Sequence, residues 1–278
     1  MKKIIPMAAV MAFAATSALA ADLPSVKAPP AYTPPPIQTW TGFYAGLNAG
    51  YTFANSTSTS IATADLGVLG GLPFTSSAAG LFNTNNSGFI GGGQIGYNYQ
   101  FYNNFLVGIE ADIQGIAGSG STATAWSGGV LPLITATGFS TSASLDYLGT
   151  VRGRLGYLIT PTILLYGTGG LAYGGVNSST SIIQPFAGVG VASSAFSDTR
   201  VGWTVGGGAE WMFLQNWSAK VEYLYYDLGT IRHSGVLAIP GVIAYGVTQT
   251  SHHFDGHVVR AGVNYHFNWG SAPVLAKY

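Results

Sequence analysis

The stretch GHVVRAGVNYHF, from Gly256 to Phe267, alternates apolar and polar residues over its whole length. One face would carry Val259, Ala261, Val263, Tyr265 and Phe267, and the other Arg260, Gly262, Asn264 and His266. Strict alternation predicts a β-strand whose two faces meet different surroundings. An apolar face with aromatic residues, opposite a polar face with an arginine, is typical of a strand between lipid and a polar barrel interior. A half-buried strand of a soluble β-sandwich would alternate too. The rest of the sequence therefore has to decide between a membrane barrel and a soluble sandwich.

The composition favours a membrane protein built from strands. Only 7% of the residues are charged, against about 25% in soluble domains, while aromatic residues make up 13% and glycine occurs 40 times. No internal stretch reaches the roughly 20 apolar residues that a membrane-spanning helix needs. Because only helices and closed barrels satisfy every backbone group in lipid, we expect a barrel. The formal net charge of zero gives no reason to expect a nucleic-acid partner.

The N-terminal residues predict export. Lys2 and Lys3 precede an apolar run from Ile4 to Ala15, and Ala18-Leu19-Ala20 offers small residues for cleavage. Residues 1–20 are therefore expected to be a secretory signal peptide. Residues 21–39 contain six prolines and are expected to form an extended periplasmic linker, which leaves residues 40–278 for the barrel. The chain has no cysteine, so it offers no lipoprotein acylation site, disulfide or thiolate metal ligand.

Seven further segments alternate apolar and polar residues in the same way as the last strand: residues 40–53, 88–101, 105–118, 144–158, 163–175, 198–213 and 217–226. Short connections at 103–104, 160–161 and 214–216 take turns with long ones at 54–87, 118–143, 176–197 and 227–255. This is the organisation of an outer-membrane barrel. The predicted fold is all-β, an eight-stranded antiparallel transmembrane β-barrel with short periplasmic turns and four long extracellular loops. The sequence leaves open whether the long loops continue as strands beyond the membrane, and residues 236–250 are a candidate for such a continuation. The last strand is expected to pair with the one that begins at Trp40, so that no edge remains.

Three motifs, in this order, resemble a known family. They are WTGFYAGLNAGY from Trp40, LLYGTGGLAYGG from Leu164 and VVRAGVNYHF from Val258. Over nearly the whole mature chain, the sequence resembles the small porin-family, outer-membrane immunogenic proteins of alphaproteobacteria, which are similar to the OmpA transmembrane barrel. The resemblance implies an eight-stranded barrel and a surface-exposed antigen, and some relatives are described as haemin-binding. It does not imply one shared molecular activity.

The inward faces of the predicted strands carry half of the charged residues of the chain. Five of the ten acidic and five of the ten basic residues lie there: Glu110, Asp112, Asp146, Glu210 and Glu222 with Arg152, Arg154, Arg200, Lys220 and Arg260. The interior of an eight-stranded barrel is just wide enough for its own side chains, and an unpaired charge there would be very costly. We expect a packed salt-bridge network in which Arg152 or Arg154 faces Glu110 and Asp112. The alternative is a narrow ion pathway lined by the same residues.

His252 and His253, at the end of the last long loop, are the candidate cofactor ligands. Imidazole can ligate haem iron, and the family resemblance makes haem the cofactor to test. Adjacent residues of a strand point in opposite directions, so the two would not easily share one metal. Solvated loop histidines are the other interpretation, and no dedicated metal site is predicted. Catalysis is not expected, because the sequence has no G-x-S-x-G nucleophile motif.

The sequence thus favours a non-enzymatic barrel of the bacterial outer membrane that supports the envelope and displays four loops at the surface. The first alternative is a surface protein that captures haem(in) or a host ligand through its loops. The second alternative is a narrow small-solute porin. The expected partners are outer-membrane lipid, lipopolysaccharide and the barrel-insertion machinery, for which Phe267 is the candidate aromatic signal.

Overall fold

The computed structural model describes residues 39–54, 57–65, 82–84, 87–102, 104–118, 120–127, 137–184, 190–239 and 243–267. The expected signal peptide, the linker up to residue 38 and residues 268–278 lie outside this part of the chain. Its regular secondary structure consists of β-strands. In the same residues, no helix is long and apolar enough to cross a membrane.

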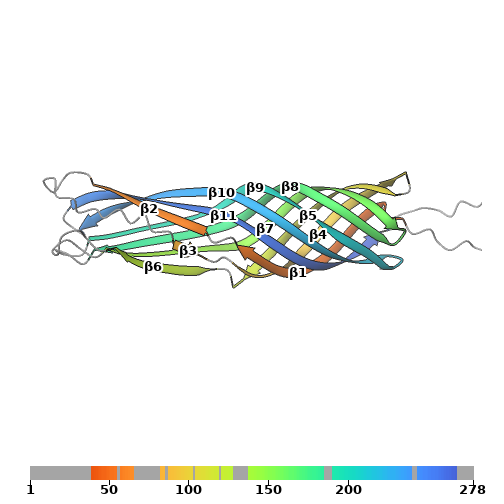
Figure 1. The fold of residues 1–278 in the computed structure, drawn as a ribbon, viewed down its shortest axis with the longest axis horizontal. Helices are drawn as coiled ribbons and strands as arrows, with labels where there is room; N and C mark the ends of the chain where they lie inside the picture. Colours follow the sequence, from red (N-terminus) through yellow and green to blue (C-terminus); the bar gives the residue numbers. More distant parts are fainter. Residues whose placement is uncertain are drawn as a thin grey trace, which may run out of the picture. The chain divides into compact units, whose positions relative to one another are not determined.

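Eight strands form a closed antiparallel ring, and Figure 1 shows them running side by side at a slant to the long axis of the view. In ring order they are β1 (Gly42–Ala54), β4 (Gly88–Phe101), β5 (Phe105–Ala117), β7 (Thr137–Thr160), β8 (Ile163–Gln184), β9 (Gly190–Leu214), β10 (Trp217–Ile239) and β11 (Ile243–Phe267). The ring closes because β1 pairs with β11, from Phe43 opposite Phe267 to Ala54 opposite Gly256. The predicted antiparallel barrel, and its closure between the first and last strands, are confirmed.

The two ends of the barrel differ. At one end, short turns join β4 to β5, β7 to β8 and β9 to β10. At the other end, β7 to β11 run on past the ends of β1, β4 and β5 (Figure 1). Three shorter strands join them there: β2 (Thr57–Asp65) pairs with β11, β3 (Phe82–Thr84) with β2, and β6 (Ser121–Ser127) with β7. We call this part the extension; it comprises residues 57–65, 82–84, 120–127, 137–146, 177–184, 190–199, 228–239 and 243–254.

The strands are longer, and the loops correspondingly shorter, than the sequence predicts. Much of 118–143, 176–197 and 227–255, which the sequence analysis assigns to loops, is paired strand. Serine and threonine occupy both faces of these segments, so the apolar alternation disappears although the backbone pairing continues. Ser142 and Ser179, for example, are cross-strand neighbours whose hydroxyl oxygens lie 2.7 Å apart. Hydrophobic periodicity detects only strands with one apolar face.

The outward face changes character where the extension begins. In the barrel it is apolar, and the side chains more than half exposed there include Leu47, Phe89, Ile95, Ile109, Leu155, Leu171, Val201 and Val221. In the extension it carries polar side chains such as Ser142, Ser179, Ser197, Arg232 and Gln249. On β9 the apolar band runs from Val201 to Phe213, close to the roughly 9–11 residues of a tilted membrane-spanning strand. The barrel therefore fits a lipid bilayer, and the extension lies beyond it.

Candidate functional site

The middle of the barrel interior holds eight charged side chains that are 0% exposed. Alternation along five strands of the ring points each of them inward. They are Glu110 and Asp112 on β5, Arg152 and Arg154 on β7, Glu210 on β9, Lys220 and Glu222 on β10, and Arg260 on β11. Four carboxylates therefore meet four cations, and the charges balance within the cluster. We call these eight residues the charged layer.

Glu110 lies at the centre of the charged layer. Its Oε1 is 2.5 Å from Arg152 Nη2 and 2.9 Å from Lys220 Nζ. Its Oε2 accepts a hydrogen bond from the hydroxyl of Tyr44 at 2.6 Å and lies 3.4 Å from Arg154 Nη1. Bidentate and shared contacts of this kind suit the rigid guanidinium fork.

Two arginines share two further carboxylates. Arg152 Nη2 and Arg260 Nη2 each donate to Asp112 Oδ2 at 2.9 Å. Arg152 Nη1 donates to Glu222 Oε1 at 2.9 Å, and Arg260 Nε donates to Glu222 Oε2 at 2.7 Å. The four residues come from β5, β7, β10 and β11, so the contacts tie together strands from different parts of the ring.

Glu210 has its own set of donors on the other side of Arg154. Arg154 Nη2 donates to Glu210 Oε2 at 2.7 Å, and the guanidinium lies 3.9 Å from the centre of the Tyr166 ring. Ser218 Oγ and Asn264 Nδ2 donate to Glu210 Oε1 at 2.5 and 2.7 Å. Each carboxylate of the charged layer thus has several donors, as a buried charge requires.

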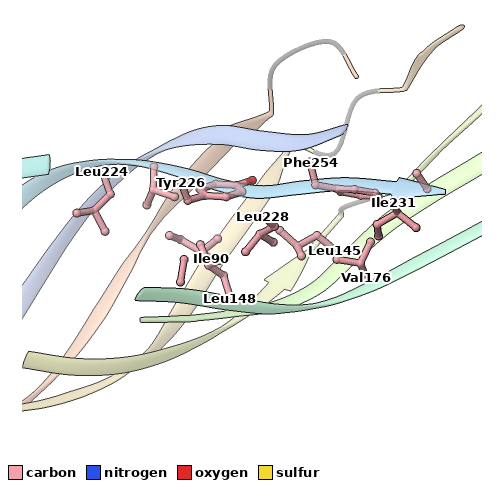
Figure 2. Close-up of a cluster of buried hydrophobic side chains, with 12 residues drawn as sticks. Ile90, Leu145, Leu148, Val176, Leu224, Tyr226, Leu228, Ile231 and Phe254 are labelled. Atoms are coloured by element: carbon pink, nitrogen blue, oxygen red, sulfur yellow. The ribbon is translucent and has the colours of Figure 1, made fainter. Parts of the chain in front are cut away.

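Clusters of buried apolar side chains lie on both sides of the charged layer. Toward the short turns the buried cluster is Trp40, Leu106, Leu158, Leu164, Tyr166 and Met212. Toward the extension, Figure 2 shows side chains from opposite walls of the barrel pointing at one another, among them Ile90, Leu145, Leu148, Val176, Leu224, Tyr226, Leu228, Ile231 and Phe254. On β7 the order along the strand is Leu158, Arg154, Arg152, Leu148. We call these clusters the turn-side and extension-side apolar layers.

Asp146 does not belong to the charged layer, and its expected inward position is wrong. Its side chain is exposed on the outer surface, where it accepts hydrogen bonds from Asn177 Nδ2 and Ser144 Oγ. The cause is a β-bulge in β7, because the register with β8 shifts between Leu145 and Tyr147. A bulge adds one residue to a strand and so reverses which face the following residues occupy. Leu145 accordingly points inward and is 1% exposed.

Arg200 points inward but lies too far along β9 to join the charged layer. It is ten residues from Glu210 on the same strand, a separation of roughly 33 Å in extended chain. Its guanidinium lies over the ring of Phe196, 5.3 Å from the ring centre. The structure therefore brings together eight of the ten charged residues that the sequence analysis places in the interior.

His252 and His253 lie on opposite faces of β11, so they do not form one site. His252 is 0% exposed and its ring stacks on that of His233, with centroids 5.7 Å apart. His253 is on the outer face, where its Nδ1 lies 3.1 Å from Thr230 Oγ1. His252 is thus a buried residue rather than the solvated loop residue that the sequence analysis also considers.

Burial controls the protonation of the inner histidines. Desolvation, together with the neighbouring His233, lowers the pKa of His252 to about 4, and desolvation also lowers the pKa of His233. Both imidazoles are therefore neutral near pH 7, the form that can bind a metal. The described residues nevertheless contain no group of three or more His, Cys, Asp or Glu side chains that could hold a metal ion.

The predicted salt-bridge network contains only formally charged residues and so leaves out the neutral members of the interior. Tyr44, Tyr166, Ser218 and Asn264 each bond a residue of the charged layer. Gln94 extends the set, because its Nε2 donates to Asn264 Oδ1. Alternation does place each of them on the inward face of its strand; what the sequence does not show is which charged residue each one bonds.

Known proteins match the chain along most of its length. The family model described as the outer membrane protein beta-barrel domain matches residues 7–267. The 31 kDa outer-membrane immunogenic protein of Brucella melitensis is 37% identical over 273 residues, which is 96% of this chain and 100% of that relative. The 22 kDa outer membrane protein of Rhizobium leguminosarum is 36% identical over 138 residues, 49% of this chain and 52% of that relative.

The similarity to solved structures is weaker. The outer membrane protein OprG of Pseudomonas aeruginosa is 13% identical with a TM-score of 0.40, and the match covers 82% of this chain and 97% of that one. A likeness at this level supports no conclusion by itself. The family model and the sequence relatives confirm the predicted resemblance and the location in the bacterial outer membrane. The chain belongs to the family of outer-membrane β-barrel proteins.

Proposed function

We propose that this protein is a non-enzymatic outer-membrane barrel that supports the envelope and displays the extension at the cell surface, with a lumen closed by packed side chains. The observation that carries the proposal is the order of layers inside the barrel. The charged layer is balanced in sign and lies between two apolar layers. An ion that entered would have to cross buried Leu, Ile and Phe side chains without its water, which costs many kcal/mol.

Conductance of the barrel in planar lipid bilayers tests the closed lumen. We expect no stable ohmic steps after insertion of the mature chain at neutral pH. Insertion itself is checked in parallel by protection of the barrel from protease in vesicles of the same lipid. Steady steps of constant conductance from inserted protein would overturn the closed lumen and support the porin alternative.

The display role is supported by the length of the extension. On β11, residues 243–254 lie beyond the apolar band, and an extended strand of that length reaches roughly 40 Å. The short turns are then periplasmic and the extension extracellular, with lipopolysaccharide around its base. Surface labelling of whole cells at Ser234→Cys, which is exposed on β10, should succeed. Labelling only after the cells are broken would contradict the orientation.

Haem capture is a second candidate, and His253 is the residue that favours it. Its side chain is 42% exposed on the outer face, with Nε2 3.7 Å from Asp227 Oδ1. If haem binds there, His253→Ala should weaken haemin binding to the purified barrel, while His252→Ala should not, because His252 is buried. Equal haemin affinity in both variants and the parent would remove this site.

A further inference from the structure

Two residues at the start of the barrel lie outside the strand ladder. The pairing of β1 begins at Gly42 opposite Asn98 of β4 and at Phe43 opposite Phe267 of β11. Residues 40–41 precede these pairs and follow directly on the proline-rich residues 21–39. We call residues 40–41 the strap. The strap can therefore move while the ladder stays paired.

Gly42 joins the strap to β1. Its φ is 141°, a backbone conformation that L side chains rarely adopt and that glycine adopts freely. A Cβ at this position would also lie 3.0 Å from the carbonyl oxygen of Phe267. The sequence therefore places a glycine hinge at the point where the strap meets the strand.

The Trp40 side chain reaches across the turn end of the barrel. Its indole Nε1–H donates to the carbonyl oxygen of Pro161 at 3.0 Å, in the turn between β7 and β8. Counted in either direction around the ring of eight strands, β8 is the fourth strand from β1. The edge of the indole also meets His266 of β11, with ring centroids 5.5 Å apart and planes at 85°. One side chain that starts at β1 is thus bonded to the opposite wall.

The strap is held by its indole and by one residue of β4. Trp40 is 1% exposed and belongs to the turn-side apolar layer, whose other members come from β5, β7, β8 and β9. Its backbone N–H donates to Gln100 Oε1 at 3.2 Å, and Gln100 N–H donates to Thr41 Oγ1 at 2.9 Å. These are side-chain contacts, which can break and re-form without unfolding a strand.

Polar groups lie directly behind the strap. Asn98, two residues before Gln100 on the same inward face of β4, is 0% exposed. Neither its Oδ1 nor its Nδ2 has a hydrogen-bond partner among the described residues. His266 Nε2 lies 2.8 Å from Ser218 Oγ, which donates to Glu210 of the charged layer. Burial of an unpaired amide is unfavourable, so water that entered here would stabilise the open mouth.

We propose that the strap is a releasable seal. Trp40 closes the turn end of the lumen, and its withdrawal about Gly42 admits water to His266 and Glu210. Because residues 21–39 directly precede Trp40, a pull on them acts on the indole before it acts on a strand. The extension-side apolar layer stays in place, so the opened state is a water-filled vestibule rather than a pore. The seal rests on the proposed function for the closed lumen and for the periplasmic side of the turns.

Thiol labelling tests the seal, since the natural chain has no cysteine. Asn98→Cys places a thiol behind the indole, and the probe is a sulfonated maleimide added to the mature chain in lipid nanodiscs. In this background Trp40→Ala should raise the labelling rate by about tenfold or more. Trp217→Ala is the matched control, because it removes an indole that is 42% exposed on the outer surface, and it should leave the rate unchanged. Equal rates with and without Trp40 would overturn the proposal.

Gly42→Ala opens the seal by a second route. It keeps the indole and strains the hinge, so it should also raise the labelling rate of the Asn98→Cys thiol. Heat-dependent mobility on gels, which reports the folded barrel, shows that each variant is folded before it is labelled. Slow labelling in folded Gly42→Ala and in folded Trp40→Ala would show that the strap does not seal the mouth.

Leu148→Cys separates the seal from the closed lumen of the proposed function. Leu148 is 1% exposed in the extension-side apolar layer, and its thiol should stay unlabelled with or without Trp40. Labelling of Leu148→Cys only after Trp40→Ala would show a continuous path and overturn the vestibule. Fast labelling in both backgrounds would overturn the closed lumen, while the Asn98→Cys comparison would still decide the seal.

Force applied through the mature N-terminus tests the release. The barrel is held in a nanodisc, and the load rises through residues 21–39. We expect a first, reversible lengthening at a force below the one that extracts strands. Trp40→Ala should abolish this step, and Trp217→Ala should keep it. A chain with Trp40 that first lengthens when strands are extracted would overturn release by the linker.

Discussion

Glu110 and Arg152 are direct partners across β5 and β7, and Glu110 Oε1 lies 2.5 Å from Arg152 Nη2. The same carboxylate is within 3.6 Å of Arg154, Lys220 and Arg260, so it contacts all four cations of the charged layer. Each of these cations was moved out of water when the barrel formed, at a cost that nearby carboxylates offset. Glu110 is therefore the residue whose loss should affect the charged layer most.

Glu110→Gln should lower the free energy of unfolding by about 3–5 kcal/mol, because it leaves a fully buried net positive charge. The amide keeps the shape of the side chain, so the effect reports charge rather than packing. Urea unfolding in detergent micelles or lipid vesicles measures it. Asp146→Asn is the matched control, since Asp146 is exposed on the outer surface, and it should change stability by no more than about 0.5 kcal/mol. Similar losses in both variants would show that the charged layer does not stabilise the barrel.

Leu148→Ala tests the extension-side apolar layer. Leu148 is 1% exposed and packs among the side chains of Figure 2, so truncation should leave a cavity and cost about 2–5 kcal/mol. Leu155→Ala on the same strand is the control. Leu155 is 69% exposed on the lipid-facing surface, where lipid chains can fill the space that is vacated. Unfolding experiments on the two variants should therefore differ clearly, and equal effects would argue against a packed inner layer.

The extension should loosen as the pH falls. The pKa of His252 is about 4 in the folded protein, below the ordinary value of about 6.5, so an opened extension binds more protons between these values. Its packing is fully stable above about pH 6.5 and loses at most about 3 kcal/mol by pH 4. His233 stacks on His252 and Phe196, and the guanidinium of Arg200 lies over the Phe196 ring.

Protease cleavage within the extension, followed from pH 7 to pH 4.5, measures this loosening. We expect cleavage to accelerate toward acid pH in the parent and to depend less on pH in His252→Phe, which fills the space without a titratable group. The protease is one whose own activity is calibrated at each pH. His253→Phe, on the outer face, is the control and should behave as the parent. A parent that is equally resistant at both pH values would contradict the prediction.

Much of the barrel follows from alternation alone. The inward positions of Glu110, Asp112, Arg152 and Arg154 are set by the period of two once one face must meet lipid. Asp146 could not be placed in this way. The bulge that turns it outward depends on how Leu145 and Tyr147 meet Val176 and Gly175 of β8, and such a register is a property of two strands rather than of one.

Apart from the candidate at residues 236–250, the strands of the extension are not predicted, for a different reason. Its residues lie outside lipid, so no apolar face was required, and Ser142 and Ser179 can pair as well as Val and Leu would. His252 was assigned to a loop on the same grounds, although it is a buried residue of β11. Hydrophobic pattern therefore predicts the membrane-embedded part of such a chain and understates the strands beyond it.

Substitution of glycine by alanine should destabilise the barrel on its inner face and have little effect on its lipid-facing surface. Gly206 points inward, and a Cβ there would lie 2.1 Å from the carbonyl oxygen of Tyr223 and 2.8 Å from Leu224 Cδ2. Gly153 faces lipid, and the nearest atom to its Cβ would be the carbonyl oxygen of Gly169 at 3.8 Å. Gly206→Ala should therefore force β9 and β10 apart and cost several kcal/mol, with reduced yield of folded barrel. Gly153→Ala should refold as the parent does, and unimpaired refolding of Gly206→Ala would show that the strands are less closely packed than described.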